Sequence, residues 1–284
     1  MKNKRSLLAI PYVGWMAFFV VAPIIMVVIY AFTTADFSFT GENFTRMGTF
    51  TVIFTRSFKL AIIATLVCLL IGYPLSYAMA KEGKSFQRVA MLLIMLPMWV
   101  NFLLRTYSMM SIMENNGLIN QFFAAIGLFD LINNLFGTDI HYFKMIGTQG
   151  AVVVGMVYNY LPFMVLPIYS TLIKMDNTLL EAAQDLGADT ATVSRKVILP
   201  LSLPGILSGV TMVFVPSVST FAISRLLGGG IQMLLGDLIE QQFLGGAYNP
   251  HLGSAIALVM MVIVVACMWI MNRFGEGEEQ AVML

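Results

Sequence analysis

Residues 252–272 read LGSAIALVMMVIVVACMWIMN, a run in which no side chain is charged. A helix of about 20 mainly apolar residues crosses the roughly 30 Å of hydrocarbon in a bilayer. A charge at the centre of such a helix costs about 3 kcal/mol, so an uncharged run of this length indicates a membrane span. The same criterion applied to the rest of the chain predicts its fold.

Four more uncharged runs are long enough to span a membrane, and a fifth qualifies if Arg105 is tolerated within it. The predicted spans are 7–32, 60–80, 89–113, 148–172, 203–224 and 252–272. We therefore expect an all-α integral membrane protein with six transmembrane helices, in a single domain over residues 1–284. The stretch 115–129 is also uncharged, but it is short and rich in amides, so we interpret it as an interfacial segment outside the bundle.

The composition supports a membrane protein and excludes several function classes. Hydrophobic residues make up 58% of the 284 residues and charged residues only 11%, against about 25% in soluble domains. The net charge is +1 without a basic run, so nucleic acid is not an expected partner. Both histidines lie in loops and no HExxH or GxSxG motif occurs, so we expect neither a metal site nor catalytic residues. Cys68 and Cys267 lie in apolar stretches and are expected to pack there.

The distribution of cations predicts the orientation in the membrane. With a cytoplasmic N-terminus, five cations fall outside and ten fall inside, the inner ones being Lys2, Lys4, Arg5, Lys81, Lys84, Arg88, Lys174, Arg195, Lys196 and Arg273. The positive-inside rule then places both termini, and the loop 174–200, in the cytoplasm.

The cytoplasmic loop 174–200 has helix signals of its own. Thr178 and Glu181 have the spacing of a capping box, which predicts a helix that starts there and stops at Gly187. Asp189 or Thr190 would cap a second short helix, which we expect to end near Pro200 and Pro204. The predicted product is two short helices joined at a glycine elbow.

The same loop resembles a known family. Glu181-Ala182-Ala183, Gly187, Val197 and Leu199-Pro200 match the EAA loop of ABC importer permeases, with Val197 where that pattern usually has Ile. The resemblance implies the ABC importer permease fold, in which this loop is a coupling helix that docks in a groove of an ATPase subunit. The residues it assigns to coupling are Glu181, Ala182, Ala183, Gly187, Leu199 and Pro200. Ala182 and Ala183 would allow close approach of the other surface.

Further segments extend the resemblance to the permeases of spermidine/putrescine importers, and among them to the first of the two permease subunits. These segments are IGYPL at 71–75, LPMWVN at 96–101, LRTY at 104–107, LPFM at 161–164 and LLEAAQDLGA at 179–188. Permeases for iron, sulfate and phosphonate share part of them, so another small solute is the alternative cargo.

The resemblance also implies the partners and the location. An extracellular binding protein would deliver polyamine to a passage between this chain and a second, related permease in a bacterial cell membrane. An ATPase dimer would bind ATP and Mg, because this chain has no GxxxxGK[ST] segment and so needs no cofactor of its own.

A polyamine passage should offer carboxylates, aromatic faces and carbonyls. The predicted spans contain no Asp or Glu, which favours weak binding. The candidates for the passage are Trp99, Asn101, Arg105, Tyr107, Tyr158, Asn159 and Tyr160, and those for the outer mouth are Glu114, Asp237 and Glu240. Packing or an interfacial belt is the alternative role for the aromatic residues, and solvation or docking of the binding protein for the acids.

Arg105 is unusual because a cation within a span is costly. We hypothesise that it pairs with Glu114 or with backbone carbonyls and helps to hold an outer gate, since a free guanidinium would repel a polyamine. A transporter driven by an ion gradient is the rival function, but it would show intramembrane acids and repeated broken helices, and the sequence indicates neither.

Overall fold

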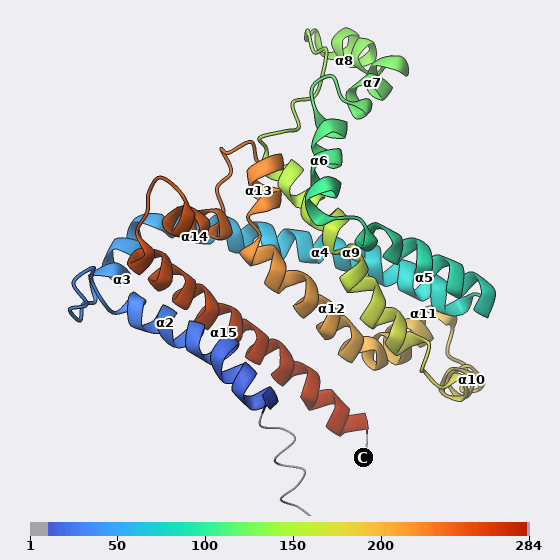
Figure 1. The fold of residues 1–284 in the computed structure, drawn as a ribbon. Coiled ribbons are helices and arrows are strands. Elements are labelled where there is room, and N and C mark those ends of the chain that lie inside the picture. Colours follow the sequence, from blue (N-terminus) through green and yellow to red (C-terminus); the bar gives the residue numbers. More distant parts are fainter. Residues whose placement is uncertain (1–10, 283–284) are drawn as a thin grey trace, which may run out of the picture. The chain divides into compact units, whose positions relative to one another are not determined.

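The computed structural model describes residues 11–282, which form helices and no strand. They divide into two compact units (Figure 1). The terminal unit comprises residues up to 52 together with 238–267. The central unit comprises residues 53–237 together with those from 268 onward.

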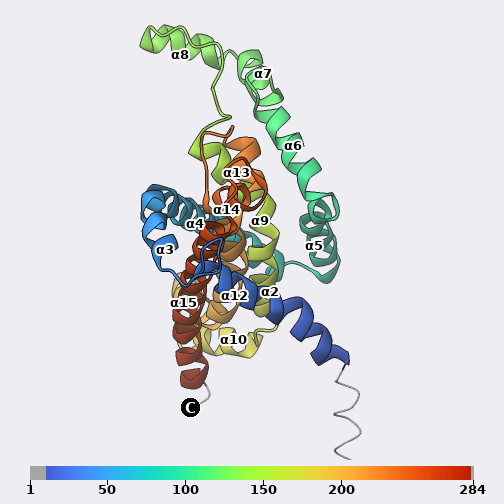
Figure 2. The same cartoon turned by 60° about the vertical axis from the view of Figure 1, so that its left-hand side comes forward.

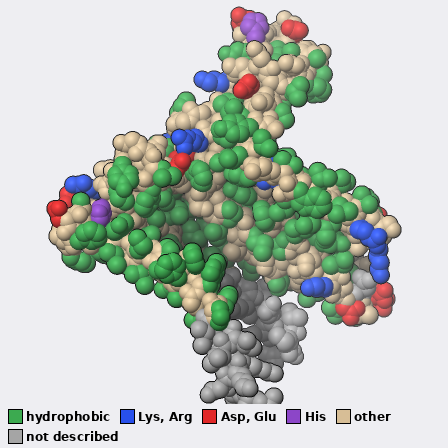
Figure 3. All heavy atoms as spheres, viewed as in Figure 1, with side chains coloured by type: hydrophobic (Ala, Val, Ile, Leu, Met, Phe, Trp, Pro, Cys, Tyr) green, Lys and Arg blue, Asp and Glu red, His purple; other side chains and the backbone are tan. Residues whose placement is uncertain are grey.

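Five helices of the described residues are long and apolar enough to cross a membrane. They are Pro11–Ala31, Glu42–Lys81, Gln149–Leu172, Thr190–Ser219 and Pro250–Met271. The first includes α2 (Ala22–Ala31), the second α3 (Glu42–Met47) and α4 (Thr51–Lys81), the third is α9 (Gln149–Leu172), and the last lies in α15 (Pro250–Val282). Figure 3 shows hydrophobic side chains spread over the long helices, with one cluster of charged side chains near α10 and the turn between α4 and α5 and others near α3 and α8. This pattern agrees with a membrane protein.

The predicted span 89–113 is not one continuous helix. α5 (Lys84–Trp99) and the helical segment from Phe102 to Ala125 are bent by 93° relative to each other. Pro97 provides no amide to the carbonyl of residue 93, and Val100 and Asn101 are extended between the two helices. The Asn101 side chain then caps α6 (Phe102–Met113), where its oxygen accepts from the Leu103 amide at 2.9 Å.

The segment predicted to lie outside the bundle is helical. It forms α7 (Leu118–Ala125), which is followed by α8 (Leu128–Phe136). Within the central unit these two helices lie beyond the end of α6, away from α9 (Figure 2). Asn120 fixes this region, because its amide donates to the carbonyls of Glu114 and Phe143, each at 3.1 Å.

The core of the central unit is built on α9, the most enclosed of its spans. α12 (Leu199–Ser219) packs along it through glycines. A Cβ at Gly205 would lie 2.9 Å from the Pro167 carbonyl oxygen, and one at Gly209 would lie 3.1 Å from that of Met164. Hydrophobic burial does not drive association of helices in lipid, so this close backbone approach is a main source of packing energy.

The first helix of the loop 174–200 is α10 (Asn177–Asp185), and its cap differs from the prediction. Asp176, not Thr178, is the N-cap, and its carboxylate accepts from the Thr178 amide at 2.9 Å. Because Asp is at least as good an N-cap as Thr, Asp176 occupies the N-cap position, and no capping box between Thr178 and Glu181 forms.

The helix ends as predicted at Gly187, whose φ of 84° is left-handed. The Gly187 amide donates to the Gln184 carbonyl and the Ala188 amide to that of Ala183, which together form a Schellman motif.

The second short helix does not end near the prolines. Asp189 caps α11 (Thr190–Val193), and the chain continues through a π segment, η3 (Ser194–Ile198), into α12. In the π segment the Leu199 amide donates to the Ser194 carbonyl, five residues back. Pro200 therefore lies in the first turn of α12. There the preceding π turn has already replaced the usual hydrogen bond to the carbonyl four residues back with one to the carbonyl five residues back. The predicted span 203–224 accordingly starts at 190 and ends at Ser219, after which α13 (Ala222–Leu227) follows.

The capping interaction of Asp176 predicts a pH dependence for α10. The hydrogen bonds from Thr178, first of all from its amide, hold the pKa of the Asp176 carboxyl below its ordinary value. Because the folded-state pKa is lowered, the stabilisation is complete above the ordinary pKa of about 3.9 and is lost as the pH falls through the lower, folded-state value. We expect the hydrogen-exchange protection of the α10 amides, corrected for intrinsic rates, to be constant near neutral pH and to fall below about pH 4.

The Asp176→Asn variant separates the cap from its charge. Asn is an equally good N-cap, so α10 should stay formed and lose this pH dependence. Asp185→Asn, a matched change at the other end of α10, should keep it. An unchanged pH profile in Asp176→Asn would contradict the assignment of the cap.

Candidate functional site

α10 presents one apolar face inward and another outward. Leu180 and Ala183 pack against the core of the central unit. Leu179 and Leu186 face out, 49% and 89% exposed, and Ala182 is exposed between them. These three positions lie on one side of a helix, and we call them the outer stripe. The three residues form a contiguous exposed apolar stripe, which is a candidate surface for binding another protein.

The other residues predicted to couple lie around the outer stripe. Glu181 is exposed beside it, and Leu199 and Pro200 are exposed at the start of α12. Ala183, in contrast, is partly buried against its own subunit. Of the two alanines, Ala182 is therefore the one that leaves room for an approaching surface.

The residues predicted to line a passage do not all gather at one place. Arg105 on α6 and Tyr158 on α9 line the same pocket of about 430 Å³, which is otherwise mainly apolar. Asn159 and Tyr160 are buried on other sides of α9. The Asn159 amide donates to the Gly155 carbonyl at 2.8 Å, and the Tyr160 hydroxyl to the Pro216 carbonyl at 3.5 Å.

Three further residues predicted for the passage are accessible but differ in role. Trp99 is 76% exposed at the end of α5, and Tyr107 is about half exposed on α6. Asn101 is exposed, but its side-chain oxygen is occupied as the cap of α6. The turn between α5 and α6 thus exposes the aromatic ring of Trp99, whereas the Asn101 side chain in the same turn serves as a helix cap.

Arg105 has a backbone partner, which is one of the two partners hypothesised. Its Nη1 donates to the Pro97 carbonyl oxygen at 2.7 Å, and its guanidinium carbon lies 5.9 Å from the centre of the Tyr158 ring. No carboxylate lies within ion-pair distance of the guanidinium among the side chains that the structure describes, and the Glu114 side chain is exposed. The carbonyl that binds Arg105 belongs to the proline that ends α5, so the cation also stabilises the bend.

The acids predicted for the outer mouth occupy different environments. Asp237 is buried, and its Oδ2 accepts from the Leu234 amide at 2.9 Å at the start of α14 (Leu235–Leu244). Glu240 is partly buried in the terminal unit, and Glu114 is exposed in the central unit. Only Glu114 is thus well exposed to solvent.

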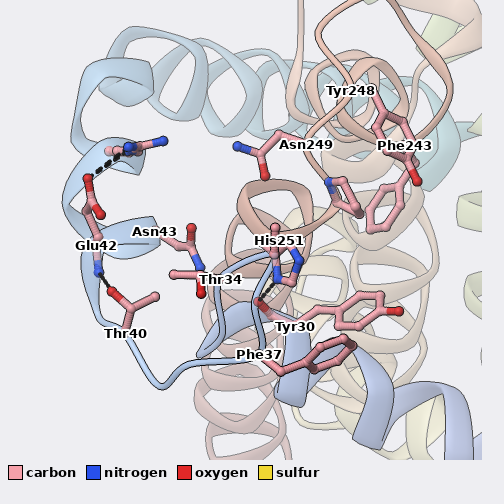
Figure 4. Close-up of a pocket in the computed structure, with 13 residues that line it drawn as sticks. Tyr30, Thr34, Phe37, Thr40, Glu42, Asn43, Phe243, Tyr248, Asn249 and His251 are labelled. Atoms are coloured by element: carbon pink, nitrogen blue, oxygen red, sulfur yellow. Dashed lines mark hydrogen bonds and ion pairs between the residues drawn. The ribbon is translucent and has the colours of Figure 1, made fainter.

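The terminal unit contains a pocket of about 730 Å³ that the sequence did not reveal (Figure 4). Its walls come from the stretch between the end of α2 and α3 and from the stretch between the end of α14 and the start of α15, and they combine aromatic rings with polar groups. Among its residues are Tyr30, Phe37, Phe243, Tyr248, Glu42, Asn43, Asn249 and His251. These two segments are some 200 residues apart in the chain, so only the fold brings them together.

Hydrogen bonds hold two residues that line this pocket, His251 and Asn43. The His251 Nδ1 lies 3.2 Å from the Tyr30 carbonyl oxygen, and the Asn43 amide donates to the carbonyls of Ala31 and Thr33. Glu42 forms an ion pair with Arg46 at 2.8 Å, so its carboxylate is already neutralised. The pocket is therefore an aromatic hollow without a free acid of its own.

Comparisons with known proteins agree with this architecture. Residues 72–276 match the family described as binding-protein-dependent transport system inner membrane component. The chain is 35% identical to the spermidine/putrescine transport system permease protein PotB of Haemophilus influenzae over 271 residues, which are 93% of this chain and 91% of the relative. It is also 35% identical to the protein of that name in Escherichia coli, over 89% of this chain and 90% of the relative.

Solved structures show the same fold. A bacterial ABC transporter involved in the import of the acidic polysaccharide alginate superposes with a TM-score of 0.74 over 97% of this chain and 96% of that chain, at 17% identity. The MetNI methionine ABC transporter superposes with a TM-score of 0.58 over 82% and 98%. The protein is thus a multi-pass membrane transport subunit rather than an enzyme, and it belongs to the family of binding-protein-dependent transport system inner membrane components.

Proposed function

We propose that this chain forms one half of a passage for polyamines in an ATP-driven importer of a bacterial cell membrane. The observation that carries the proposal is the 34–35% identity, over about nine-tenths of the chain, to several permeases named for spermidine and putrescine. A second, related permease would form the other half, and an extracellular binding protein would deliver the cargo.

The chemistry of the passage fits weak binding of a flexible polycation. The predicted spans hold no carboxylate, which would bind a polyamine tightly, while Trp99, Tyr107 and Tyr158 expose aromatic faces. An aromatic face attracts an alkylammonium group by about 0.5–2 kcal/mol, depending on how far the site is desolvated. Several such contacts guide a cation without trapping it, as transport requires.

Coupling to ATP hydrolysis would occur through α10. The outer stripe of Leu179, Ala182 and Leu186 supplies apolar surface, and Glu181 supplies a charge beside it. An ATPase dimer would hold ATP and Mg and receive this helix in a groove. The excess of cations on that side of the membrane supports a cytoplasmic position for the loop and for both termini.

Reconstitution tests the cargo. We expect proteoliposomes that contain this chain, its second permease and the ATPase to accumulate radiolabelled spermidine or putrescine when the loaded binding protein is outside and ATP is inside. Iron, sulfate and phosphonate serve as competitors, because permeases for these solutes share part of the sequence pattern. Uptake that follows one of these solutes and ignores polyamine would overturn the proposed cargo, and uptake driven by an ion gradient without ATP would overturn the importer class.

A substitution on the outer stripe tests coupling. Ala182→Arg adds bulk and charge to an exposed position, so the subunit should assemble and fold normally while ATP-driven uptake falls at least tenfold. Gln184→Arg is the matched control, since Gln184 is also exposed on α10 but lies outside the outer stripe. Normal uptake by Ala182→Arg, or equal loss in both variants, would contradict docking through this face.

A further inference from the structure

Arg105 is a buried cation with unused hydrogen-bond donors. It is 9% exposed, its Nη1 donates to the Pro97 carbonyl oxygen, and its Nε is buried without a hydrogen-bond partner. Its Nη2 has no hydrogen-bond partner either among the residues that the structure describes. A neutral carbonyl satisfies one donor and leaves the charge uncompensated, which is an unfavourable state for a buried guanidinium.

The unused donors lie on one edge of the guanidinium. Nε and Nη2 direct their N–H bonds to the same side, in the parallel arrangement that matches the two oxygens of a carboxylate or phosphate. Nη1, on the other side, is the nitrogen already used by Pro97. With Nη1 occupied, the Nε–Nη2 edge is the two-bond edge of Arg105 that stays without a partner.

Arg105 lines a pocket whose walls suit a short apolar stem. Besides Arg105, the pocket of about 430 Å³ is lined mainly by apolar side chains, among them Val100, Met109, Ile112 and Val154. The centre of the Tyr158 ring lies 5.9 Å from the guanidinium carbon. An occupant should thus present an anionic group on an aliphatic stem, as an Asp or Glu side chain does.

The pocket has the composition of a protein interface. Arg105, Met109, Met113 and Tyr158 line it, and Tyr158 is 43% exposed. Aromatic residues, Met and Arg are the types enriched in the cores of protein interfaces. This composition favours a protein partner over a lipid headgroup.

We propose that a carboxylate from the second permease subunit enters this pocket and pairs with the Nε–Nη2 edge of Arg105. The described part of this chain supplies no such group. The pair neutralises a cation that would repel a polyamine, and an ammonium group of the cargo can compete for the same carboxylate. Arrival of cargo would then release the link between the two permeases. This last step rests on the proposed polyamine cargo, whereas the pairing rests only on the proposed second permease.

Cysteine cross-linking in the complete importer tests the pairing without reference to cargo. Arg105→Cys is combined in turn with a cysteine at each Asp or Glu of the second permease, and disulfide formation is measured without ATP in nanodiscs. We expect one acidic position to cross-link strongly. Lys59→Cys, which replaces an exposed cation on α4, is the matched control and should not cross-link to that position.

Charge exchange then tests the chemistry. Arg105→Glu should raise ATP hydrolysis without binding protein several-fold by weakening the closed state, and replacing the cross-linked acid by Arg should restore the low rate. Arg105→Lys should restore it only in part, because an ammonium lacks the two-bond edge. Absence of a cross-link, or failure of the exchanged pair to restore the low rate, would overturn the proposal. A phospholipid that copurifies with wild type but not with Arg105→Gln, together with no cross-link, would assign the edge to lipid phosphate instead.

Discussion

The fold depends on one constraint, which is that hydrocarbon offers no hydrogen-bond partner to a backbone amide or carbonyl. Every segment at membrane depth must therefore satisfy its own polar groups, and helices do so best. At two places where this chain departs from a regular helix, nearby groups supply the missing hydrogen bonds. At the break after Pro97, the Asn101 side chain accepts from an amide of α6 and Arg105 donates to the Pro97 carbonyl. At the start of α12, a π turn before Pro200 keeps the backbone hydrogen-bonded.

The same constraint explains how the central unit packs. Without a hydrophobic force between helices in lipid, contact energy comes from close approach, and glycines on α12 allow its backbone to approach α9. α12, which packs along α9, is preceded directly by η3, α11 and the loop that carries α10. A force applied to α10 would therefore reach the membrane helices through a continuous helix and the capped turn at Gly187, rather than through a flexible linker.

Much of this architecture could be predicted because its signals are local. Uncharged runs identify the spans, and Gly187 ends α10 in the conformation that a glycine favours. The break at Val100 and Asn101 was harder to predict, because proline is tolerated within many membrane helices and only the following Asn101 cap turns the kink into a bend of 93°. The spacing of Thr178 from Glu181 favours Thr178 as the cap, although Asp176 competes for the same amides.

The candidate site was less predictable because it depends on which side of a helix each residue occupies. Tyr158, Asn159 and Tyr160 are consecutive, yet only the first lines the pocket of Arg105. Ala182 and Ala183 likewise divide between outside and inside. The aromatic pocket near His251 joins distant segments and has no sequence signature at all.

The central claim is that α10 is a cytoplasmic docking surface, and the accessibility of Leu186 tests it most directly. A Leu186→Cys variant, with Cys68 and Cys267 replaced by Ser, can be labelled with a membrane-impermeant maleimide in vesicles of both orientations. The account predicts labelling only in inside-out vesicles, and protection from labelling when the ATPase subunit is bound. Labelling from the outside, or labelling that the ATPase does not change, would contradict it.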